Sequence, residues 1–394
     1  MAVPKHKKSK SKRDSRRAQK KIEGPSVASC PECGEEGGLY DHSPERVWRH
    51  LDTCQFGTYL HARLPRVNCS VHGVKQVAAP WAELGSRFTL LFENRLIDIL
   101  KECDVTGAGR IAAVSWDEGW GIMDRAVIRG MKRKQGKVPE YVGIDEKSFA
   151  KRHKYETLVC DLVKGTVECV LQERTQESLE GYWGQFSLEE LADTEAIAMD
   201  MWEPYIHAVE QQLPQADIVH DKFHIAKYLG EAVDKVRKAE NRHLVKQQDG
   251  TLKGTKYLWL TNPNHWTEQQ QASFKDLKDK GLKVARAWSI KEMFSELWGY
   301  RYEKAAKNFF KKWHCWATHA RLKPMAEVAK KLKRHLENIL TYLKHRITNA
   351  VAEGLNSKIQ QVKSAARGFR NFENFRIAIL FFCGKLDMYP QKSQ

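Results

Sequence analysis

The amino-acid sequence predicts a multidomain α/β protein built around a mixed five-stranded sheet, with small modules ahead of the sheet and a helical insertion within it. Strand and helix patterns follow one another in the order β-β-β-α-β-α-β between residues 141 and 220. Residues 26–78 are turn-rich and contain four cysteines and several histidines, and the chain after residue 223 is almost wholly helical in pattern. A length of 394 residues allows two or three such units.

The first 21 residues form a strongly basic tail. They carry ten Lys/Arg against Asp14 alone, a net charge of +9 out of the +17 of the whole chain. This charge predicts a polyanionic partner, and the tail is either a solvated, disordered arm or a specific phosphate-binding arm. The tail has no apolar face, so a lipid surface is not the expected partner.

The cysteine count and the hydropathy pattern indicate the compartment. Nine cysteines, an odd number without the spacing of a disulfide framework, indicate a reducing environment. The chain has no apolar run of 18 residues and no apolar segment after its charged start, so we expect neither a membrane span nor a signal peptide. Twelve Trp and fifteen Phe supply large side chains for a folded core. We therefore expect a soluble, cytoplasmic protein.

Two pairs of potential zinc ligands lie in residues 26–78. Cys30 and Cys33 form one pair, and Cys69 and His72 form the other, each with two intervening residues. Such pairs grip two sides of a tetrahedral zinc ion, and a glycine directly after each pair (Gly34, Gly73) lets the backbone turn beneath the metal. The alternative is that these cysteines are buried free thiols.

A rival second pair is His50 and Cys54, at positions i and i+4 of a potential helix. We rank this pair below Cys69 and His72 because the basic sequence around it suggests a surface that faces DNA.

Helical patterns occupy the segment before the sheet. Residues 88–101 have apolar positions at helical spacing, and residues 107–113 are a run of small residues typical of a short helix. Ser115 and Glu118 have the spacing of a capping box at the start of a second helix. Two short helices with a tight joint fit a helix-turn-helix that reads DNA, and the alternative is an ordinary helical hairpin. Residues 130–139 are interpreted as a linker.

The sheet and the elements after it are expected at definite places. The patterns predict strands at 141–144, 155–163 and 166–171, a helix at 175–190, a strand that ends at Asp200, a helix at 202–212, a strand at 216–220, and late helices at 347–363 and 372–383. Lys164-Gly165 is expected to form the hairpin turn between the second and third strands. The Trp-rich stretch 287–316 is interpreted mainly as packed core, and the alternative is a role in binding DNA ends or in stabilising a DNA flap.

Three acidic residues stand where phosphodiester chemistry needs them. Asp145 follows the first strand, Asp200 closes the fourth, and Glu353 lies in a late helix. Carboxylates at strand ends hold Mg²⁺ through few protein ligands and leave room for phosphate oxygens. One acid at a strand end is usually a solvated turn residue, but the joint arrangement matches the RNase H-like fold, in which strands one and four are neighbours. Asp145, Asp200 and Glu353 would then form a metal-binding triad.

Several motifs resemble, in order, those of the ISL-three family of insertion-sequence transposases. They are CPECG, PRVNC-x-x-HG, VGIDEKSF, MDMWEPY, IVHDKFH, KYLWLTNPNHWT, NAVAEGLNSKIQ and RGFRNFENFR, and together they cover about residues 28–385. The resemblance implies an RNase H-like DDE catalytic domain, with Asp145, Asp200 and Glu353 on its acidic positions. It also implies a helical insertion at about residues 243–344.

The identity of the second acid is open to one alternative, Asp221. We prefer Asp200 because strand four is expected beside strand one, with strand five one place further out. Asp221 and His224 resemble the D-x-x-H motif of related transposases and would support the metal site or a bent DNA strand, although His224 is also interpretable as a core histidine. Asn349 and Asn356 share the helical face of Glu353 and are expected to orient it or to contact DNA.

Residues 1–21 resemble a different protein, the zinc-ribbon protein of the bacterial large ribosomal subunit, and the likeness runs up to CPECG. A fused or wrongly assigned start would explain this likeness. Because the likeness covers less than a tenth of the chain, it does not decide the function.

The resemblance implies a DNA transposase that cuts and joins strands with two Mg²⁺ or Mn²⁺ ions per active site and carries a structural Zn²⁺. Its partners would be double-stranded DNA, as terminal inverted repeats and as target, and further copies of the chain in a homodimer or larger synaptic assembly. The alternatives are a catalytically inactive regulator that binds DNA and a structure-specific nuclease that does not join strands. The expected regions are a basic tail (1–25), a zinc-binding module (26–78), a helix-turn-helix region with linker (79–138), the first part of the catalytic core (139–242), a helical insertion (243–344), and the last part of the core with the C-terminal helix (345–394).

Overall fold

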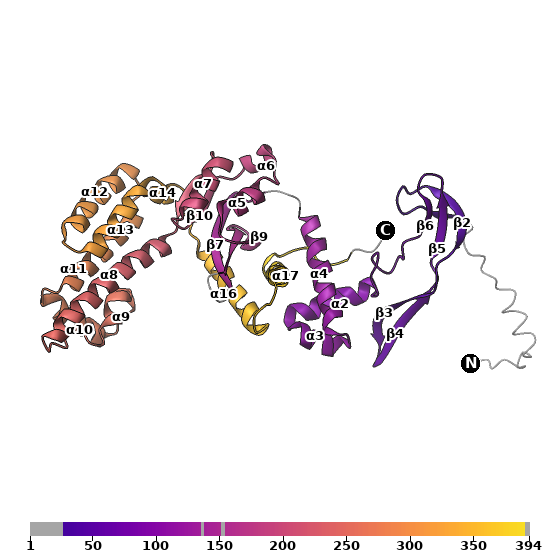
Figure 1. The fold of residues 1–394 in the computed structure, drawn as a ribbon, viewed down its shortest axis with the longest axis horizontal. Helices are drawn as coiled ribbons and strands as arrows, with labels where there is room; N and C mark the ends of the chain where they lie inside the picture. The colour runs from indigo at the N-terminus through magenta and orange to yellow at the C-terminus, as the bar shows by residue number, and fades with distance from the viewer. Residues whose placement is uncertain (1–26, 135–137, 151–153, 391–394) are drawn as a thin grey trace, which may run out of the picture. The chain divides into compact units, whose positions relative to one another are not determined.

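The computed structural model describes residues 27–134, 138–150 and 154–390, so the basic tail lies outside the described residues (Figure 1). The chain divides into two compact units. The first extends to Gly130 and takes in the residues from Asp387 onward, and the second is Met131–Leu386.

Strands dominate residues 27–76 of the first unit. A four-stranded antiparallel sheet, in the order β1-β2-β5-β6, consists of β1 (Val27–Ser29), β2 (Glu36–His42), β5 (Pro65–Cys69) and β6 (Gly73–Gln76). The strands β3 (Arg46–Thr53) and β4 (Phe56–Ala62) form a separate two-stranded antiparallel sheet, and Arg49 of β3 makes a further isolated bridge to Phe88. The potential helix through His50 and Cys54 is therefore wrong. Trp48 of β3 is buried against Leu64 and Ala82, and this packing suits an extended strand that alternates its two faces.

Three helices follow these strands in the described part of the chain: α2 (Leu90–Glu102), α3 (Val105–Ala112) and α4 (Trp116–Arg133). The predicted capping box is present, since the Ser115 hydroxyl accepts from the Glu118 amide at 3.2 Å and the Ser115 amide donates to the Glu118 carboxylate at 2.8 Å. α4 runs four residues, 130–133, into the segment expected to be linker. Its last turn ends in Lys132 and Arg133, whose charges stabilise a helix C-terminus.

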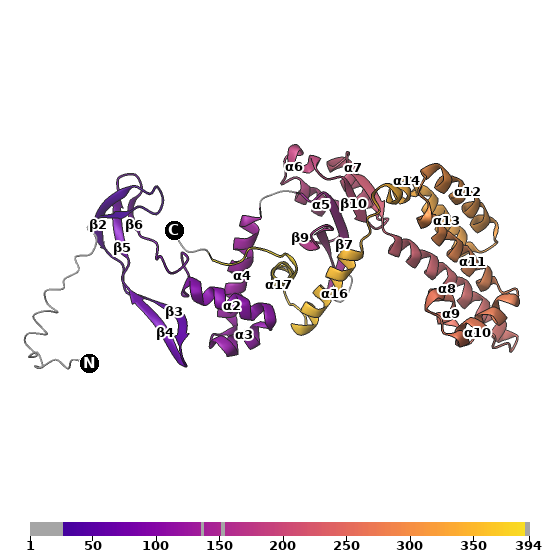
Figure 2. The same ribbon diagram turned by 180° about the vertical axis from the view of Figure 1, so that it is seen from behind.

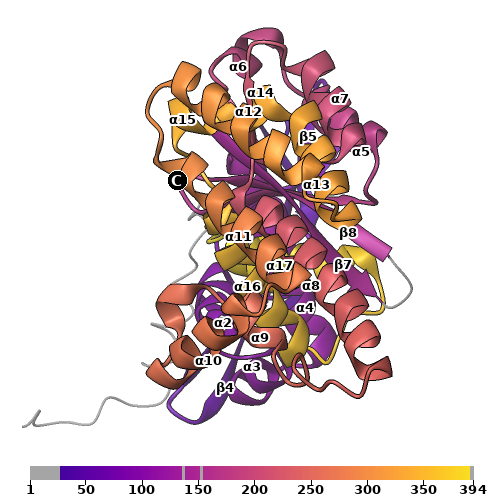
Figure 3. The ribbon, with the colours of Figure 1, turned by 90° about the vertical axis from the view of Figure 1, so that its left-hand side faces the viewer.

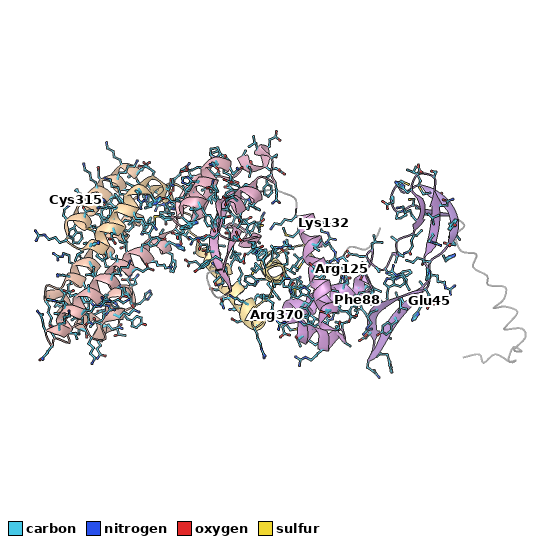
Figure 4. The ribbon with its side chains drawn as sticks, viewed as in Figure 1. Glu45, Phe88, Arg125, Lys132, Cys315 and Arg370 are labelled. Carbon is cyan, nitrogen blue, oxygen red and sulfur yellow. The ribbon has the colours of Figure 1, made fainter. Side chains whose placement is uncertain are left out.

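One buried carboxylate ties α2 to α4. Glu93 is fully buried, and it accepts from Arg125 at 2.7 Å and from Arg129 at 3.1 Å. Figure 4 labels Arg125 and Lys132 on α4. The two guanidinium groups compensate the cost of burying the carboxylate, so the helices are held in one relative position within this unit.

The second unit contains the mixed five-stranded sheet, in the order β11-β10-β7-β8-β9. Its strands are β7 (Tyr141–Ala150), β8 (Lys154–Asp161), β9 (Thr166–Gln172), β10 (Ala196–Met199) and β11 (Asp217–His220). β7, β8 and β9 form an antiparallel meander, whereas β10 lies parallel to both β7 and β11. The fourth strand is thus beside the first, with the fifth one place further out, as the sequence predicted.

The helices around this sheet largely follow the sequence pattern. The helix expected at 175–190 is instead two helices, α5 (Gln176–Trp183) and α6 (Leu188–Ala192). The break occurs because α5 ends at Gly184 and Ser187 opens α6 with a capping box to Glu190. The turn between β8 and β9 contains Gly165 at φ +62°, a conformation that favours glycine. α7 (Glu203–Gln212) precedes β11.

The long helix α8 (Lys222–Lys246) leads into a helical region that packs on it (Figure 3). This region consists of α9 (Lys256–Leu260), η1 (Pro263–His265), α10 (Glu268–Asp279), α11 (Lys283–Ser295), η2 (Glu296–Gly299), α12 (Glu303–His319), α13 (Lys323–Arg334), α14 (Leu336–Leu340) and α15 (Tyr342–His345). Trp313 and Phe294 of the Trp-rich stretch are almost fully buried in its core, as predicted.

Two late helices return to the sheet. α16 (Ala350–Ala365) packs against β7, and α17 (Phe372–Cys383) packs against β9 and α16 (Figure 2). The strands and these helices therefore bring together segments that are 200 residues apart in the chain. In the described part of the chain, no helix combines the length and the apolar character that crossing a lipid bilayer requires.

Candidate active site and metal centre

Cys30, Cys33, Cys69 and His72 converge in the first unit, and their ligand atoms all lie within 4.8 Å of one another. The Cys33 and Cys69 sulfurs are 3.6 Å apart, and the His72 Nδ1 atom is 3.8 Å from the Cys30 sulfur and 3.7 Å from that of Cys69. Sulfur ligands about 2.3 Å from a tetrahedral zinc ion are about 3.8 Å apart, so the observed spacing fits Zn²⁺.

The backbone around these ligands has the predicted form. Gly34 and Gly73 have φ values of +76° and +67°, and each follows one ligand pair. Backbone amides of His72 and Val71 lower the pKa of Cys69 to about 6, which favours the thiolate that binds metals. The rival residues lie elsewhere: His50 Nδ1 is 2.9 Å from the Thr89 hydroxyl, and Cys54 is exposed in the β3–β4 turn. The structure therefore places a Cys₃His set, and not His50 or Cys54, in the zinc site.

In the second unit, three aspartates stand at one level across three neighbouring strands. Gly143 of β7 pairs with Ala198 of β10, so Asp145 and Asp200 both lie two residues beyond this pair. Met199 pairs with His220 of β11, so Asp221 follows at the same level on the third strand. Because these strands are parallel, the three acids lie along one edge of the sheet.

Asp145 is held by hydrogen bonds at both of its oxygens. Its Oδ1 accepts from the Glu146 amide at 2.7 Å, and its Oδ2 accepts from the Asn356 side-chain amide at 2.5 Å. Burial raises the pKa of Asp145 above its usual value, and the charges of Asp221 and Asp200 raise it further. The carboxylate is therefore oriented but electrostatically unfavourable, which a bound cation would relieve.

Asp200 has a different environment, because three groups donate to it. The Tyr228 hydroxyl lies 3.0 and 2.9 Å from its two oxygens, the Met201 amide donates at 2.6 Å, and His224 Nδ1 is 3.1 Å from Oδ2. Burial opposes ionisation, but His224 and Tyr228 outweigh it and hold the pKa of Asp200 well below its usual value. Asp200 is consequently a stable carboxylate.

Asp221 and Glu353 each have one carboxylate oxygen to which no group in the described part of the chain donates a hydrogen bond. Asp221 Oδ2 and Glu353 Oε1 are buried without a hydrogen-bond partner, as are the amide oxygens of Asn349 and Asn356. Burial raises the pKa of Glu353, and the charges of Asp221 and Asp145 raise it further, so these acids lie within electrostatic range. Carboxylate oxygens without donors are the ligand type that a hard divalent cation takes. Among the described residues, only the four zinc ligands have their ligand atoms within 4.8 Å of one another. The acids therefore fit Mg²⁺ or Mn²⁺ by ligand type and electrostatics, and not as a closed set of ligands.

Asn349, at the N-cap of α16, and Asn356, within it, both contact residues of β7. Asn349 donates to the Ile144 carbonyl at 3.3 Å, and Asn356 donates to Asp145. Lys147 adds a bond from β7 to the Asn356 carbonyl at 3.0 Å. These contacts anchor α16 on β7, and this anchoring sets the position of Glu353.

Sequence reasoning missed three residues of this site. Tyr228 lies one turn after His224 on α8, a spacing that indicates a shared face. Glu146 forms an ion pair with Arg174, and burial raises the pKa of Glu146 to about 7. Glu146 follows Asp145 directly in the chain, but no pattern indicated that it would be half-buried.

Gly143 allows the close approach of α16 to β7. A Cβ atom at Gly143 would lie 2.7 Å from Asn349 Oδ1 and 2.7 Å from the Leu162 side chain. We expect Gly143→Ala to displace the start of α16, to lower the free energy of unfolding by about 1–3 kcal/mol, and to reduce the activity of the site roughly 10–100-fold. Thermal unfolding and a rate measurement on the same preparation test this.

The matched control is Gly181→Ala on α5, where an added Cβ meets no atom within 4 Å. We expect the control to retain full activity and equal or greater stability. Equal activity of the two variants would remove the close-approach argument.

Comparisons with known proteins agree with the two sites. A family model for an ISL3 transposase domain matches residues 142–379, and a model described as the zinc-finger of transposase IS204/IS1001/IS1096/IS1165 matches residues 26–72. The transposase for insertion sequence element IS1557 of Mycobacterium tuberculosis is 26% identical over 371 residues, covering 87% of this chain and 82% of that protein. The transposase for IS1001 of Bordetella parapertussis is 25% identical over 359 residues, covering 90% and 88%.

A separate similarity covers only the start of the chain. Residues 2–36 match the Ribosomal L32p protein family. The large ribosomal subunit protein bL32 of Desulfatibacillum aliphaticivorans is 66% identical over 35 residues, which are 9% of this chain and 60% of that protein. The matched residues include the zinc ligands Cys30 and Cys33, but not Cys69, His72 or any of the carboxylates of the second unit.

Proposed function

The chain belongs to the ISL3 family of transposases, and we propose that it binds the ends of a bacterial insertion sequence and catalyses strand cleavage and strand transfer by a DDE mechanism. The observation that carries the proposal is the row of carboxylates at the ends of β7, β10 and β11, with the buried, unpaired Glu353 oxygen beside them. The strand order also supports an RNase H-like core, in which the strands that bear the first two acids are neighbours.

Asp145, Asp200 and Glu353 would hold two Mg²⁺ or Mn²⁺ ions. When bound, the ions would supply the Lewis acidity that phosphodiester cleavage and transesterification need. Asn356 orients Asp145, and Asn349 anchors the helix that carries Glu353. No serine or tyrosine nucleophile is required, because water and then a DNA 3′-hydroxyl would be the attacking groups.

Asp200 remains our preferred second acid, with Asp221 as the alternative. Asp200 lies on the strand directly beside β7, and His224 and Tyr228 keep it ionised, the form that binds a cation. Asp221 would support the site from the next strand. Burial raises the pKa of Asp221, so Asp221 is less readily ionised than Asp200 and is the weaker candidate for a cation ligand. His224 would position Asp200.

DNA recognition is assigned to the first unit. The zinc module would support the helices α3 and α4, which a tight turn at Ala113 joins and which we propose as a helix-turn-helix. The ligands would be terminal inverted repeats and target DNA in double-stranded form. Two ends must be held together, so we propose a homodimer or larger synaptic assembly acting in the bacterial cytoplasm at the nucleoid.

The test is a cleavage assay with a DNA fragment that carries the element's two ends, with and without Mg²⁺. We expect nicks at the element ends that leave a 3′-hydroxyl, and joined products when target DNA is added. Nicks without joined products would indicate a structure-specific nuclease. Binding to the ends without any cleavage in Mg²⁺ or Mn²⁺ would indicate an inactive DNA-binding regulator.

A further inference from the structure

We propose that the exposed face of α13, with the neighbouring part of α12, is a binding site for the phosphate backbone of double-stranded DNA, and that it holds the duplex beside the carboxylates. The proposal deepens the proposed function by naming a DNA-binding surface outside the first unit.

The charge of the chain is concentrated in two places. Residues 303–334, which span α12 and α13, contain ten Lys/Arg and two Glu, a net charge of +8. Residues 1–21 carry a net charge of +9. These two segments together account for the whole net charge of +17, so the remaining residues have a net charge of zero. The basic surface of α12 and α13 is therefore not a sample of a uniformly basic protein.

The packing of α13 presents these charges outward. Met325, Ala329 and Leu332 are fully buried along one side of α13, which packs against α8 and α12. The opposite side exposes Lys330 and Arg334. A helix of 12 residues is about 18 Å long, which corresponds to about five base steps of duplex DNA at 3.4 Å per step.

The exposed cations of this face lack neutralising partners. Lys330, Lys333 and Arg334 form no ion pair with any carboxylate in the described residues. Burial lowers the pKa of His314 on α12, and the charges of Lys333 and Lys330 lower it further, so α12 and α13 share one positive field. A polyanion on this face would relieve that repulsion. Figure 4 labels Cys315, the neighbour of His314, on α12.

The basic face continues to the active site through two side chains. The Lys331 ammonium lies 3.6 Å from the centre of the Tyr228 ring, and the Tyr228 hydroxyl donates to Asp200. A duplex that lies along α13 would therefore present a phosphodiester near the carboxylates. The far end of α8, where α9 packs, lies outside this basic surface and supplies a control region (Figure 1).

The experiment measures equilibrium binding of the full chain to an end-containing duplex over a range of NaCl concentrations, without divalent cations. The test variant is Lys330→Gln/Lys333→Gln/Arg334→Gln. We expect its Kd at 0.1 M NaCl to rise roughly ten- to hundredfold, and the slope of log K against log salt to fall by about 0.9 for each charge removed. All three side chains are exposed, so the thermal midpoint should stay unchanged.

The control is Lys246→Gln/Lys253→Gln/Lys275→Gln, which removes three exposed charges from the α9 and α10 end of the same unit. Screening beyond about 10 Å at this salt should leave its slope close to that of the unmodified chain. An unchanged slope in the α13 variant, or an equal fall in both variants, would overturn the proposal.

This outcome is separable from the proposed function. If the unmodified chain cleaves DNA but the α13 variant keeps the same salt slope, the proposed reaction stands and the proposed DNA-binding surface is wrong. If the chain never cleaves DNA but the α13 variant shows the expected smaller salt slope, the proposed surface stands and the proposed reaction is wrong.

Discussion

Asp145→Asn and Glu353→Gln are each expected to reduce metal-dependent DNA cleavage by at least about 10³-fold, which corresponds to about 4 kcal/mol of transition-state stabilisation. Both changes remove a proposed cation ligand and keep the shape of the side chain. Burial raises the pKa of both acids, so each charge is unfavourable to the fold at neutral pH. Glu353→Gln should therefore be as stable as the unmodified chain or more stable. In Asp145→Asn the relief of charge is offset, because the new amide group meets one of the two donors that now bond to the Asp145 oxygens. Cleavage rates and thermal unfolding measured in parallel test this expectation.

Three further variants, Glu189→Gln, Asp200→Asn and Asp221→Asn, help to interpret that result. Glu189→Gln changes an exposed acid on α6 and should alter neither activity nor stability. Asp200→Asn should abolish cleavage too, but it also removes the partner of His224 and should lower the free energy of unfolding by about 1–3 kcal/mol. Cleavage that survives in Asp145→Asn or Glu353→Gln at a comparable rate would exclude these residues from the reaction. Cleavage that survives in Asp200→Asn and is lost in Asp221→Asn would make Asp221 the second acid.

Removal of zinc is expected to unfold the start of the first unit. The core of the four-stranded sheet consists of Cys30, Val67 and Cys69 with Ala28 against them, so little apolar burial stabilises it without metal. A structural zinc ion contributes about 10 kcal/mol or more to folding in such small modules. A chelator, or Cys33→Ser, should release one zinc per chain and abolish selective binding to the element ends. The unfolding of the second unit should not change.

Cys54→Ser is the matched control, because Cys54 is exposed in the β3–β4 turn and is not among the four converging ligands. It should retain both the zinc and the DNA selectivity. Zinc content and calorimetric unfolding measure the two responses independently. Selective binding that persists in a zinc-free preparation would show that the metal is not needed for recognition.

Local patterns predicted most elements of this fold. Several elements lie within a few residues of their expected positions: α2, α7, α16, α17, β9, β10 and β11. Their apolar periodicity and their capping residues are properties of residues that are close in sequence, so local patterns predict them. Segments where a tertiary partner decides the conformation were less predictable. The β3–β4 hairpin was not expected, because Trp48 becomes buried only through Leu64 and Ala82. The interruption between α5 and α6 was missed although Ser187 and Glu190 encode it.

The motifs in the sequence also led to the correct family and to the zinc ligands. Spacing alone could not rank Cys69 and His72 over His50 and Cys54, because both pairs permit metal binding locally. The sheet decides between them, since β5 and β6 carry Cys69 and His72 to the turn that holds Cys30. The contacts of Tyr228 and Arg174 with the carboxylates depend on how α8 and the loop after β9 pack, which no local pattern encodes.

The sequence by itself determined the order of the strands and helices, the two ligand pairs of the zinc module, and which acids stand at strand ends. These properties depend on residues that are close along the chain, so periodicity and spacing record them. The tertiary structure decided that Asp145, Asp200 and Asp221 lie at one level of the sheet and that Glu353 on α16 comes within electrostatic range of Asp221 and Asp145. It also decided that Asp200 is held as a carboxylate and that Asp221 and Glu353 carry unpaired oxygens. Those properties depend on burial and on charges from distant segments, and such environments exist only once β7, β10, β11 and α16 have packed together.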